Sequence, residues 1–97
     1  MAAKKTIVII DDHPLFREGL KSIIARNALF EVIGEAGDAR KGLGVVKNLG
    51  PDLVIVDISL PDKSGIEVAR SIRGRFPGVR ILIVSMHSKI DYIVEAF

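Results

Sequence analysis

The stretch Ile7-Val8-Ile9-Ile10-Asp11-Asp12-His13-Pro14 joins four consecutive apolar residues to two adjacent acids and a proline. A strand exposed on one face alternates apolar with polar residues, whereas an unbroken β-branched run is typical of a strand covered on both faces in a parallel sheet. Residues 53–56 and 81–84 have the same character, and residues 30–35 alternate in part, which suits an edge strand. These runs predict a parallel sheet whose first central strand ends directly at two acids.

Helical spacing of apolar residues follows each predicted strand. Pro14 fits the first turn of a helix, where the missing N–H is not needed, and Asp38 and Ser64 fit the N-caps of two more. Gly50-Pro51 and residues 76–78 fit as stops. The side chains predicted to face the sheet are Phe16, Leu20, Ile23 and Ile24, then Leu43, Val46 and Leu49, then Ile66, Ala69 and Ile72. Ser88 is predicted to cap a fourth helix that carries Ile90, Ile93, Val94 and Phe97.

Length and composition limit the classes of protein to consider. With 97 residues, 48% hydrophobic and 27% charged, the chain fits one folded domain. The absence of cysteine excludes disulfides and thiolate chemistry, and a net charge of +2 is too small to indicate nucleic-acid binding. No apolar run exceeds four residues and no signal-peptide pattern is present, so we expect a cytoplasmic protein without a membrane segment.

Polar side chains stand at the ends of the predicted central strands. Asp11 and Asp12 follow the first run, Asp57 follows the run at 53–56, and Ser85 follows the run at 81–84. Ligands of open parallel sheets bind beyond the carboxyl ends of the strands. Any one of these acids could be a helix cap or a solvated loop residue, which for Asp12 alone is the favoured interpretation. As a set, they are predicted to converge on one edge of the sheet.

Three carboxylates at close range repel one another unless a cation lies between them. Mg²⁺ prefers oxygen ligands and commonly combines one or two carboxylates with phosphate oxygens. Because no cluster of histidine and cysteine is evident, the residues favour Mg²⁺ over Zn²⁺. An aspartate beside such an ion can accept a phosphoryl group and become an acyl phosphate.

Three segments in register resemble the receiver domain of two-component response regulators: residues 11–20, residues 57–61 and residues 65–67. The Asp-Asp-His-Pro opening resembles the subgroup with a LuxR-type (NarL/FixJ) DNA-binding output domain. The resemblance covers essentially the whole chain. It implies an α/β, flavodoxin-like, doubly wound parallel sheet of strand order 2-1-3-4-5 and a single receiver domain over residues 1–97.

The resemblance also implies roles for individual residues. Asp57 is the implied phosphoacceptor, Ser85 the hydroxyl that moves toward the phosphoryl oxygens, and Pro61 and Gly65 the residues that shape the adjoining loop. The implied Mg²⁺ ligands are Asp11, Asp12, Asp57 and the backbone carbonyl of Ser59.

The two histidines invite sharper hypotheses. His13 could move protons or accept a group, but a first-turn residue before Pro14 is the favoured interpretation. His87 stands two residues beyond Ser85, and we expect His87 and Ser59 to tune how fast the acyl phosphate hydrolyses.

The family pattern continues past a fourth helix with a lysine-bearing fifth strand and a fifth helix. Lys63 and Lys89 do not match the family lysine, so we expect a receiver domain that is incomplete at its C-terminus, with the DNA-binding output domain not present. The run at 81–84 is then an apolar sheet edge, and self-association, such as a homodimer, is expected through that edge or through the fourth helix.

The function expected from the resemblance is a phosphoacceptor module. A sensor histidine kinase supplies the phosphoryl group, and the domain controls transcription through its output domain without being a turnover enzyme. Two alternatives stay open. One is a non-phosphorylated interaction domain of the same fold. The other is a Mg²⁺-dependent phosphohydrolase, although such enzymes carry Asp-x-Asp after the first strand, where this chain has adjacent Asp11 and Asp12.

Overall fold

The computed structural model describes residues 3–85 and 93–96, which form a sheet with helices on both faces. The elements are β1 (Lys5–Ile10), α1 (Pro14–Ala25), β2 (Phe30–Ala36), α2 (Ala39–Leu49), β3 (Leu53–Asp57), α3 (Gly65–Arg75), β4 (Arg80–Val84) and β5 (Ile93–Ala96). Within these ranges no helix has the length and apolar character needed to cross a membrane.

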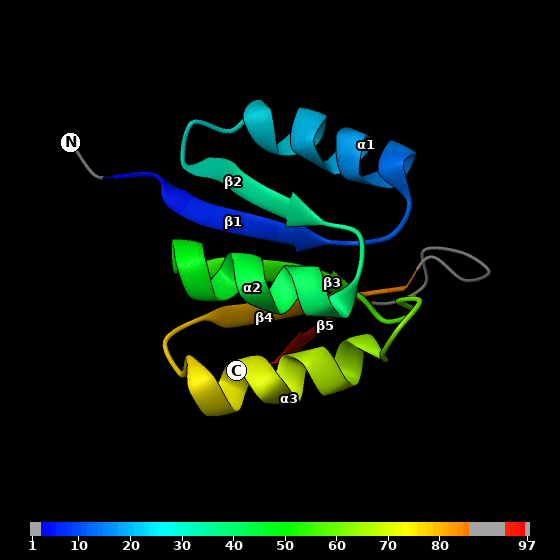
Figure 1. Cartoon of the computed structure of the whole chain (residues 1–97). Helices are drawn as coiled ribbons and strands as arrows, with labels where there is room; N and C mark the ends of the chain where they lie inside the picture. The colour runs from blue at the N-terminus through cyan, green and yellow to red at the C-terminus, as the bar shows by residue number, and fades with distance from the viewer. Residues whose placement is uncertain (1–2, 86–92, 97) are drawn as a thin grey trace.

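The strands lie in the order β2-β1-β3-β4-β5 (Figure 1). The pairs β1–β2, β1–β3 and β3–β4 are all parallel, so the predicted doubly wound parallel sheet is confirmed for the first four strands. The chain leaves β1 toward β2 on one side and returns to β3 on the other. The strand order therefore reverses beside β1, and this is where ligands of such sheets bind.

The segment after β4 differs from the prediction. Ile93–Ala96 forms a strand, β5, that pairs antiparallel with β4, so the predicted fourth helix is wrong for these residues. The rest of that prediction, at 88–92 and 97, lies outside the described residues. A strand is favoured here because Ile93 and Val94 are β-branched and because pairing satisfies the backbone groups along β4. The predicted unpaired edge at β4 is therefore also wrong.

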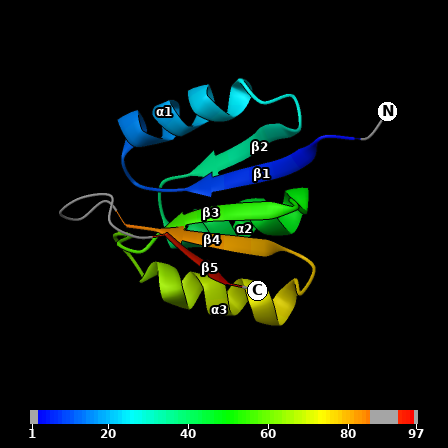
Figure 2. The same ribbon diagram turned by 180° about the vertical axis from the view of Figure 1, so that it is seen from behind.

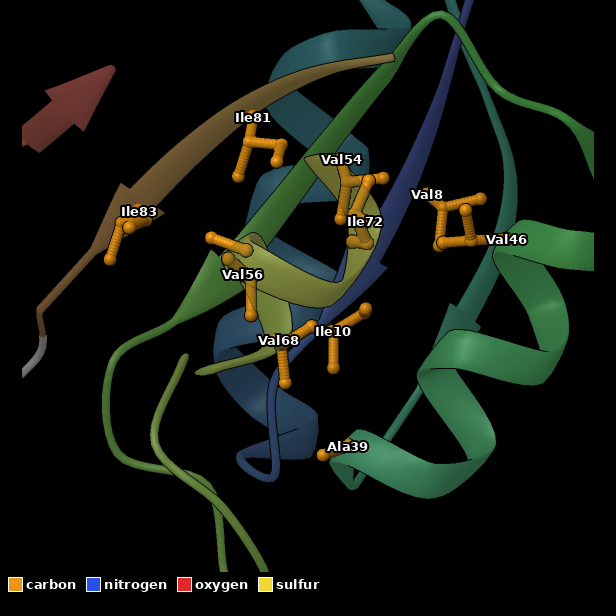
Figure 3. Close-up of a cluster of buried hydrophobic side chains, with 11 residues drawn as sticks. Val8, Ile10, Ala39, Val46, Val54, Val56, Val68, Ile72, Ile81 and Ile83 are labelled. Carbon is orange, nitrogen blue, oxygen red and sulfur yellow. The ribbon is translucent and has the colours of Figure 1, made fainter. Parts of the chain in front are cut away.

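Two apolar layers cover the two faces of the sheet. The larger contains Val8, Ile10, Val54, Val56, Ile81 and Ile83 from the strands, packed against α2 and α3. Figure 3 shows these strand side chains together with Val46 of α2 and with Val68 and Ile72 of α3. The smaller layer places Ile7, Ile9 and Ile55 beneath Leu20 and Ile24 of α1. Because successive residues of a strand point to opposite faces, the unbroken apolar runs supply both layers.

The two views in Figures 1 and 2 show α2 in front of the sheet and then behind it. Its ends are as predicted. Asp38 accepts a hydrogen bond from the backbone N–H of Lys41, and Gly50 closes the helix with a left-handed φ of 56°. Ser64 likewise caps α3 by accepting from the N–H of Ile66.

Three of the residues predicted to face the sheet are exposed instead: Ile23 at 63%, Leu49 at 46% and Ile66 at 42%. Each lies in the first or last turns of its helix, at the margin of the apolar stripe.

Gly42 marks the closest approach of α2 to the sheet. A Cβ at this position would lie 2.6–2.9 Å from three side-chain carbons of Ile10, which is itself fully buried. A Cβ on Gly44, two residues later on the same helix, would meet no side chain within 4 Å. A substitution at Gly42 therefore affects both packing and helix propensity, whereas one at Gly44 affects helix propensity alone.

Replacing each glycine with alanine should change stability in opposite directions. We expect Gly42→Ala to lower the free energy of unfolding by about 1–2 kcal/mol, because overpacking exceeds the gain in helix propensity. Gly44→Ala should raise it by about 0.5–1 kcal/mol, since the open site keeps only the propensity gain. Urea unfolding followed by circular dichroism measures both. Equal shifts would show that Gly42 is not a packing constraint.

Candidate functional site

Three polar residues lie buried at the carboxyl edge of the sheet. Asp11 follows β1, Asp57 is the last residue of β3, and Ser85 follows β4. Their exposed fractions are 1%, 1% and 8%. In the β3–β4 register Asp57 lies opposite Val84, so Ser85 is the next residue along. The predicted convergence of the strand ends is thus present in the structure.

The acids form one tight group together with a histidine. Ligand atoms of Asp11, Asp12, His13 and Asp57 all lie within 4.8 Å of one another. The structure therefore brings Asp12 to the site, as predicted for the set of acids, although for Asp12 alone a helix cap or a solvated loop residue is the favoured interpretation. It also brings His13, for which a first-turn residue before Pro14 is the favoured interpretation.

The ring of His13 lies among the three carboxylates. Its Nδ1 is 2.9 Å from Asp12 Oδ1, 3.2 Å from Asp11 Oδ1 and 3.8 Å from Asp57 Oδ2. His13 is the N-cap of α1 but makes no side-chain capping bond. Its backbone N–H instead donates to Asp11 Oδ1 at 2.7 Å. The turn from β1 into α1 therefore delivers the ring to the site, a placement that the sequence pattern does not reveal.

In each buried aspartate, one carboxylate oxygen accepts a hydrogen bond and the other has no partner among the described residues. Asp57 Oδ1 accepts the backbone N–H of Ser59 at 3.0 Å, and Asp11 Oδ1 accepts that of His13. Asp57 Oδ2 and Asp11 Oδ2 are buried and have no hydrogen-bond partner among the described residues. Buried carboxylate oxygens without partners are costly. A hard divalent cation would satisfy both, and oxygen-rich ligands of this kind suit Mg²⁺.

The surroundings of Asp57 disfavour its charged form. Burial is the main cause that raises the pKa of Asp57 above the ordinary aspartate value, and the negative charges of Asp11 and Asp12 raise it further. The N–H of Ser59 and the ring of His13 act in the opposite direction. A bound cation would counter the repulsion and favour an ionised, reactive carboxylate.

The loop after Asp57 folds back against it. The N–H of Gly65 donates to the carbonyl of Ile58 at 2.8 Å, and Ser59 and Ser64 form an isolated antiparallel bridge. A Cβ on residue 65 would lie 2.2 Å from the backbone oxygen of Asp57. Gly65 is therefore the residue that permits this close return, whereas Pro61 lies exposed in the same loop.

Asp62 anchors the loop, although no sequence pattern pointed to it. Its carboxylate accepts from the backbone N–H groups of Ala39 at 2.9 Å and Arg40 at 3.1 Å, at the start of α2. These bonds lower the pKa of Asp62, with the bond from Ala39 as the largest cause. The start of α2 thereby holds the loop beside Asp57.

The remaining predicted site residue, His87, lies outside the described residues.

Arg17 supports the other side of the site. Its Nη1 donates to the backbone carbonyl of Asp11, and its Nε donates to Glu35 Oε1 of β2 at 2.8 Å. Lys21 donates to the second oxygen of Glu35. The bond from Lys21 is the main cause that lowers the pKa of Glu35. The only sequence signal for Arg17 is a charged residue beside the apolar stripe of α1, which does not by itself indicate a role at the site.

Removing the guanidinium should loosen the segment that carries Asp11. We expect Arg17→Met to lower the free energy of unfolding by about 1–2 kcal/mol, because two charged hydrogen bonds are lost from a partly buried position. Arg26→Met is the matched control, since Arg26 is exposed at the end of the same helix. The control should stay within about 0.5 kcal/mol of the parent in urea unfolding. Similar losses in both variants would contradict a support role for Arg17.

The raised pKa of Asp57 predicts a pH-dependent stability difference. In metal-free buffer at neutral pH, Asp57→Asn should raise the free energy of unfolding by about 1–3 kcal/mol, because it removes a buried charge that Asp11 and Asp12 repel. The gain should shrink as pH falls through the raised pKa and be small near pH 4, about the ordinary aspartate pKa, where Asp57 is increasingly protonated. Denaturant unfolding at both pH values measures the difference. A variant no more stable than the parent at neutral pH would contradict it.

Curated relatives match nearly all of this chain. It is 40% identical over 92 residues to the transcriptional regulatory protein DegU of Brevibacillus brevis, covering 95% of this chain and 39% of that protein. It is 33% identical over 91 residues to the nitrate/nitrite response regulator protein NarL of Escherichia coli K12, covering 94% of this chain and 42% of that protein. The chain thus spans about two fifths of the length of these relatives.

A solved structure and a family model lead to the same family as these relatives. The signal receiver domain of the putative response regulator NarL from Mycobacterium tuberculosis superposes with a TM-score of 0.84 at 34% identity, over 91% of this chain and 71% of that one. The family model for the response regulator receiver domain matches residues 7–97. With its acids gathered at the ends of a 2-1-3-4 parallel sheet, this chain belongs to the receiver domain family of two-component response regulators.

Proposed function

We propose that Asp57 accepts a phosphoryl group from a sensor histidine kinase, with Mg²⁺ held beside it. Asp11, Asp12, Asp57 and the backbone carbonyl of Ser59 are the proposed ligands. The observation that carries the proposal is the pair of buried oxygens, Asp57 Oδ2 and Asp11 Oδ2, that have no hydrogen-bond partner among the residues described. A fold that keeps two such oxygens together favours a cation at that place.

The ion, when bound, would offset the charge of the carboxylates and of the phosphoryl oxygens during transfer. The chain's own residues set the geometry. The N–H of Ser59 holds Asp57 Oδ1 at 3.0 Å, which leaves Oδ2 directed toward the acidic group. In the transfer, an oxygen of Asp57 forms a bond to phosphorus as the phosphorus–nitrogen bond of a kinase phosphohistidine breaks. The departing imidazole takes up one proton from solvent at its second nitrogen, so it leaves as a neutral ring.

Ser85 and the loop residues have supporting roles in this proposal. Ser85 lies one residue beyond the register partner of Asp57, within reach for a hydroxyl that moves toward a phosphoryl group. The close return at Gly65 and the exposed Pro61 shape the loop around Asp57. Ser59 and His87 are proposed to tune hydrolysis of the acyl phosphate, and for His87 this stays a prediction from the sequence.

The proposed output is control of transcription through a DNA-binding domain, and DegU, a longer protein, is named a transcriptional regulatory protein. The domain would assist its own phosphorylation and dephosphorylation without acting as a turnover enzyme. Because its kinase donor and its DNA target would both act in the cytoplasm, we expect the domain to act there. Homodimer formation also stays a prediction, and it no longer has the support of an unpaired β4 edge.

The test is covalent labelling of the whole chain. With Mg²⁺ and acetyl phosphate, intact mass should increase by one phosphoryl group, and peptide mapping should assign it to Asp57. Asp57→Asn should remain unlabelled. Asp12→Asn should label more slowly by about tenfold or more, as expected when groups that organise a metal site are lost. Asp38→Asn is the matched control, because it removes a carboxylate elsewhere and keeps the cap of α2.

Two outcomes would overturn the proposal. Absence of any adduct in the parent chain would favour the non-phosphorylated interaction domain. Repeated turnover of a phosphate ester that is lost in Asp11→Asn but kept in Asp57→Asn would favour the phosphohydrolase, because the nucleophile would then follow the first strand.

A further inference from the structure

We propose that the ring of His13 is a nitrogen ligand of the acidic site, which gives the site a marked affinity for borderline transition metals such as Zn²⁺. The proposal rests on the proposed function only in using the same three carboxylates. It adds a fourth donor and a metal class that the oxygen ligands alone would not favour.

The first argument is the spacing of the donors. Two ligands about 2.0–2.2 Å from one ion, at angles between those of octahedral and tetrahedral coordination, are separated by about 3.0–3.5 Å. The Nδ1 of His13 lies 2.9, 3.2 and 3.8 Å from oxygens of Asp12, Asp11 and Asp57. The ring nitrogen thus lies at ligand-like distances from oxygens of Asp12 and Asp11, and a few tenths of an ångström farther from the oxygen of Asp57.

A second, independent observation points to a cation at this place. The Oδ2 atoms of Asp11 and Asp57 are buried without hydrogen-bond partners among the described residues, and both side chains are only 1% exposed. These oxygens are additional to Asp11 Oδ1, which already accepts the N–H of His13. The buried side of the site therefore offers oxygens that no hydrogen bond within the described part of the chain satisfies.

The outer side of the site is open. The side chain of His13 is 56% exposed and that of Asp12 is 35% exposed. The ring can therefore adjust by a few tenths of an ångström, and water can complete the coordination of an ion from the solvent side. The ring makes no capping bond to α1, and its Nδ1 contacts the carboxylates of Asp11 and Asp12 instead.

The donor set determines which metals gain most. Imidazole suits Zn²⁺, Ni²⁺ and Cu²⁺, whereas Mg²⁺ is bound mainly through carboxylates and water. One nitrogen among three carboxylates should therefore strengthen Zn²⁺ binding far more than Mg²⁺ binding. Both ions use the same carboxylates, so they should compete for the site.

A different role for the ring makes the opposite prediction. A protonated ring could simply occupy the place of a cation and be displaced when a metal binds. Its removal would then strengthen the binding of Mg²⁺ and Zn²⁺ alike. The two roles are therefore distinguished by the sign and the metal dependence of one substitution.

The experiment is calorimetric titration of Mg²⁺ and Zn²⁺ into the whole chain without a histidine tag. We expect His13→Ala to weaken Zn²⁺ binding by about tenfold or more, while Mg²⁺ binding changes by less than about threefold. Arg26→Ala is the control, since Arg26 is exposed at the opposite end of α1 from His13. His13→Gln serves as a second variant, and circular dichroism checks that each variant is folded.

Pulsed electron paramagnetic resonance of bound Mn²⁺ gives a direct readout. Hyperfine coupling to a histidine nitrogen should be present in the parent and in Arg26→Ala, and absent in His13→Ala. Equal changes for both metals, tighter binding in His13→Ala, or coupling that persists in that variant would overturn the inference. Failure of Mg²⁺ to bind the parent chain would instead count against the proposed function, and the Zn²⁺ comparison would still decide the role of His13.

Discussion

The arrangement of the site depends on like-charged carboxylates that strand pairing holds together against their repulsion. Parallel pairing of β1 with β3 fixes where those strands end, and so brings Asp11 and Asp57 to one edge of the sheet with only 1% of each exposed. Burial and neighbouring negative charges raise the pKa of Asp57. One oxygen of Asp11 and one of Asp57 have no hydrogen-bond partner among the residues described. A site built this way is energetically unfavourable when empty and gains most from a cation, and that is the physical basis of a chemically switchable module.

The two sides of the site are held by different means. On the side of β3, the close approach of Gly65 to the carbonyl of Asp57 and the bonds of Asp62 to the start of α2 fix the loop. On the side of β1, Arg17 joins the carbonyl of Asp11 to Glu35 of β2. The hydrogen bonds of Asp62, and that of Arg17 to Asp11, run to backbone atoms, so neither support uses the side-chain oxygens of Asp11 or Asp57.

His13 adds a ring nitrogen to a group of three carboxylates. Its ring nitrogen lies within 3.8 Å of an oxygen of each of three carboxylates, and its backbone N–H donates to Asp11. The same residue could therefore determine both the shape of the site and its preference among metals. Pro14 favours this arrangement, because a residue before proline prefers the extended backbone that His13 adopts at φ −102° and ψ 104°.

Local patterns determined the central strands, the three helices between them, the caps at Asp38 and Ser64, and the set of acids at the strand ends. They did so because burial on both faces, helix capping and strand order leave direct marks on residue type. Only the tertiary structure decided that Ile93–Ala96 is a strand, since that choice depends on the free edge of β4. Only it placed His13, Arg17 and Asp62 around the site, because their partners are separated from them by turns or by many residues, and the direction of a side chain across such a contact is not encoded in any short pattern.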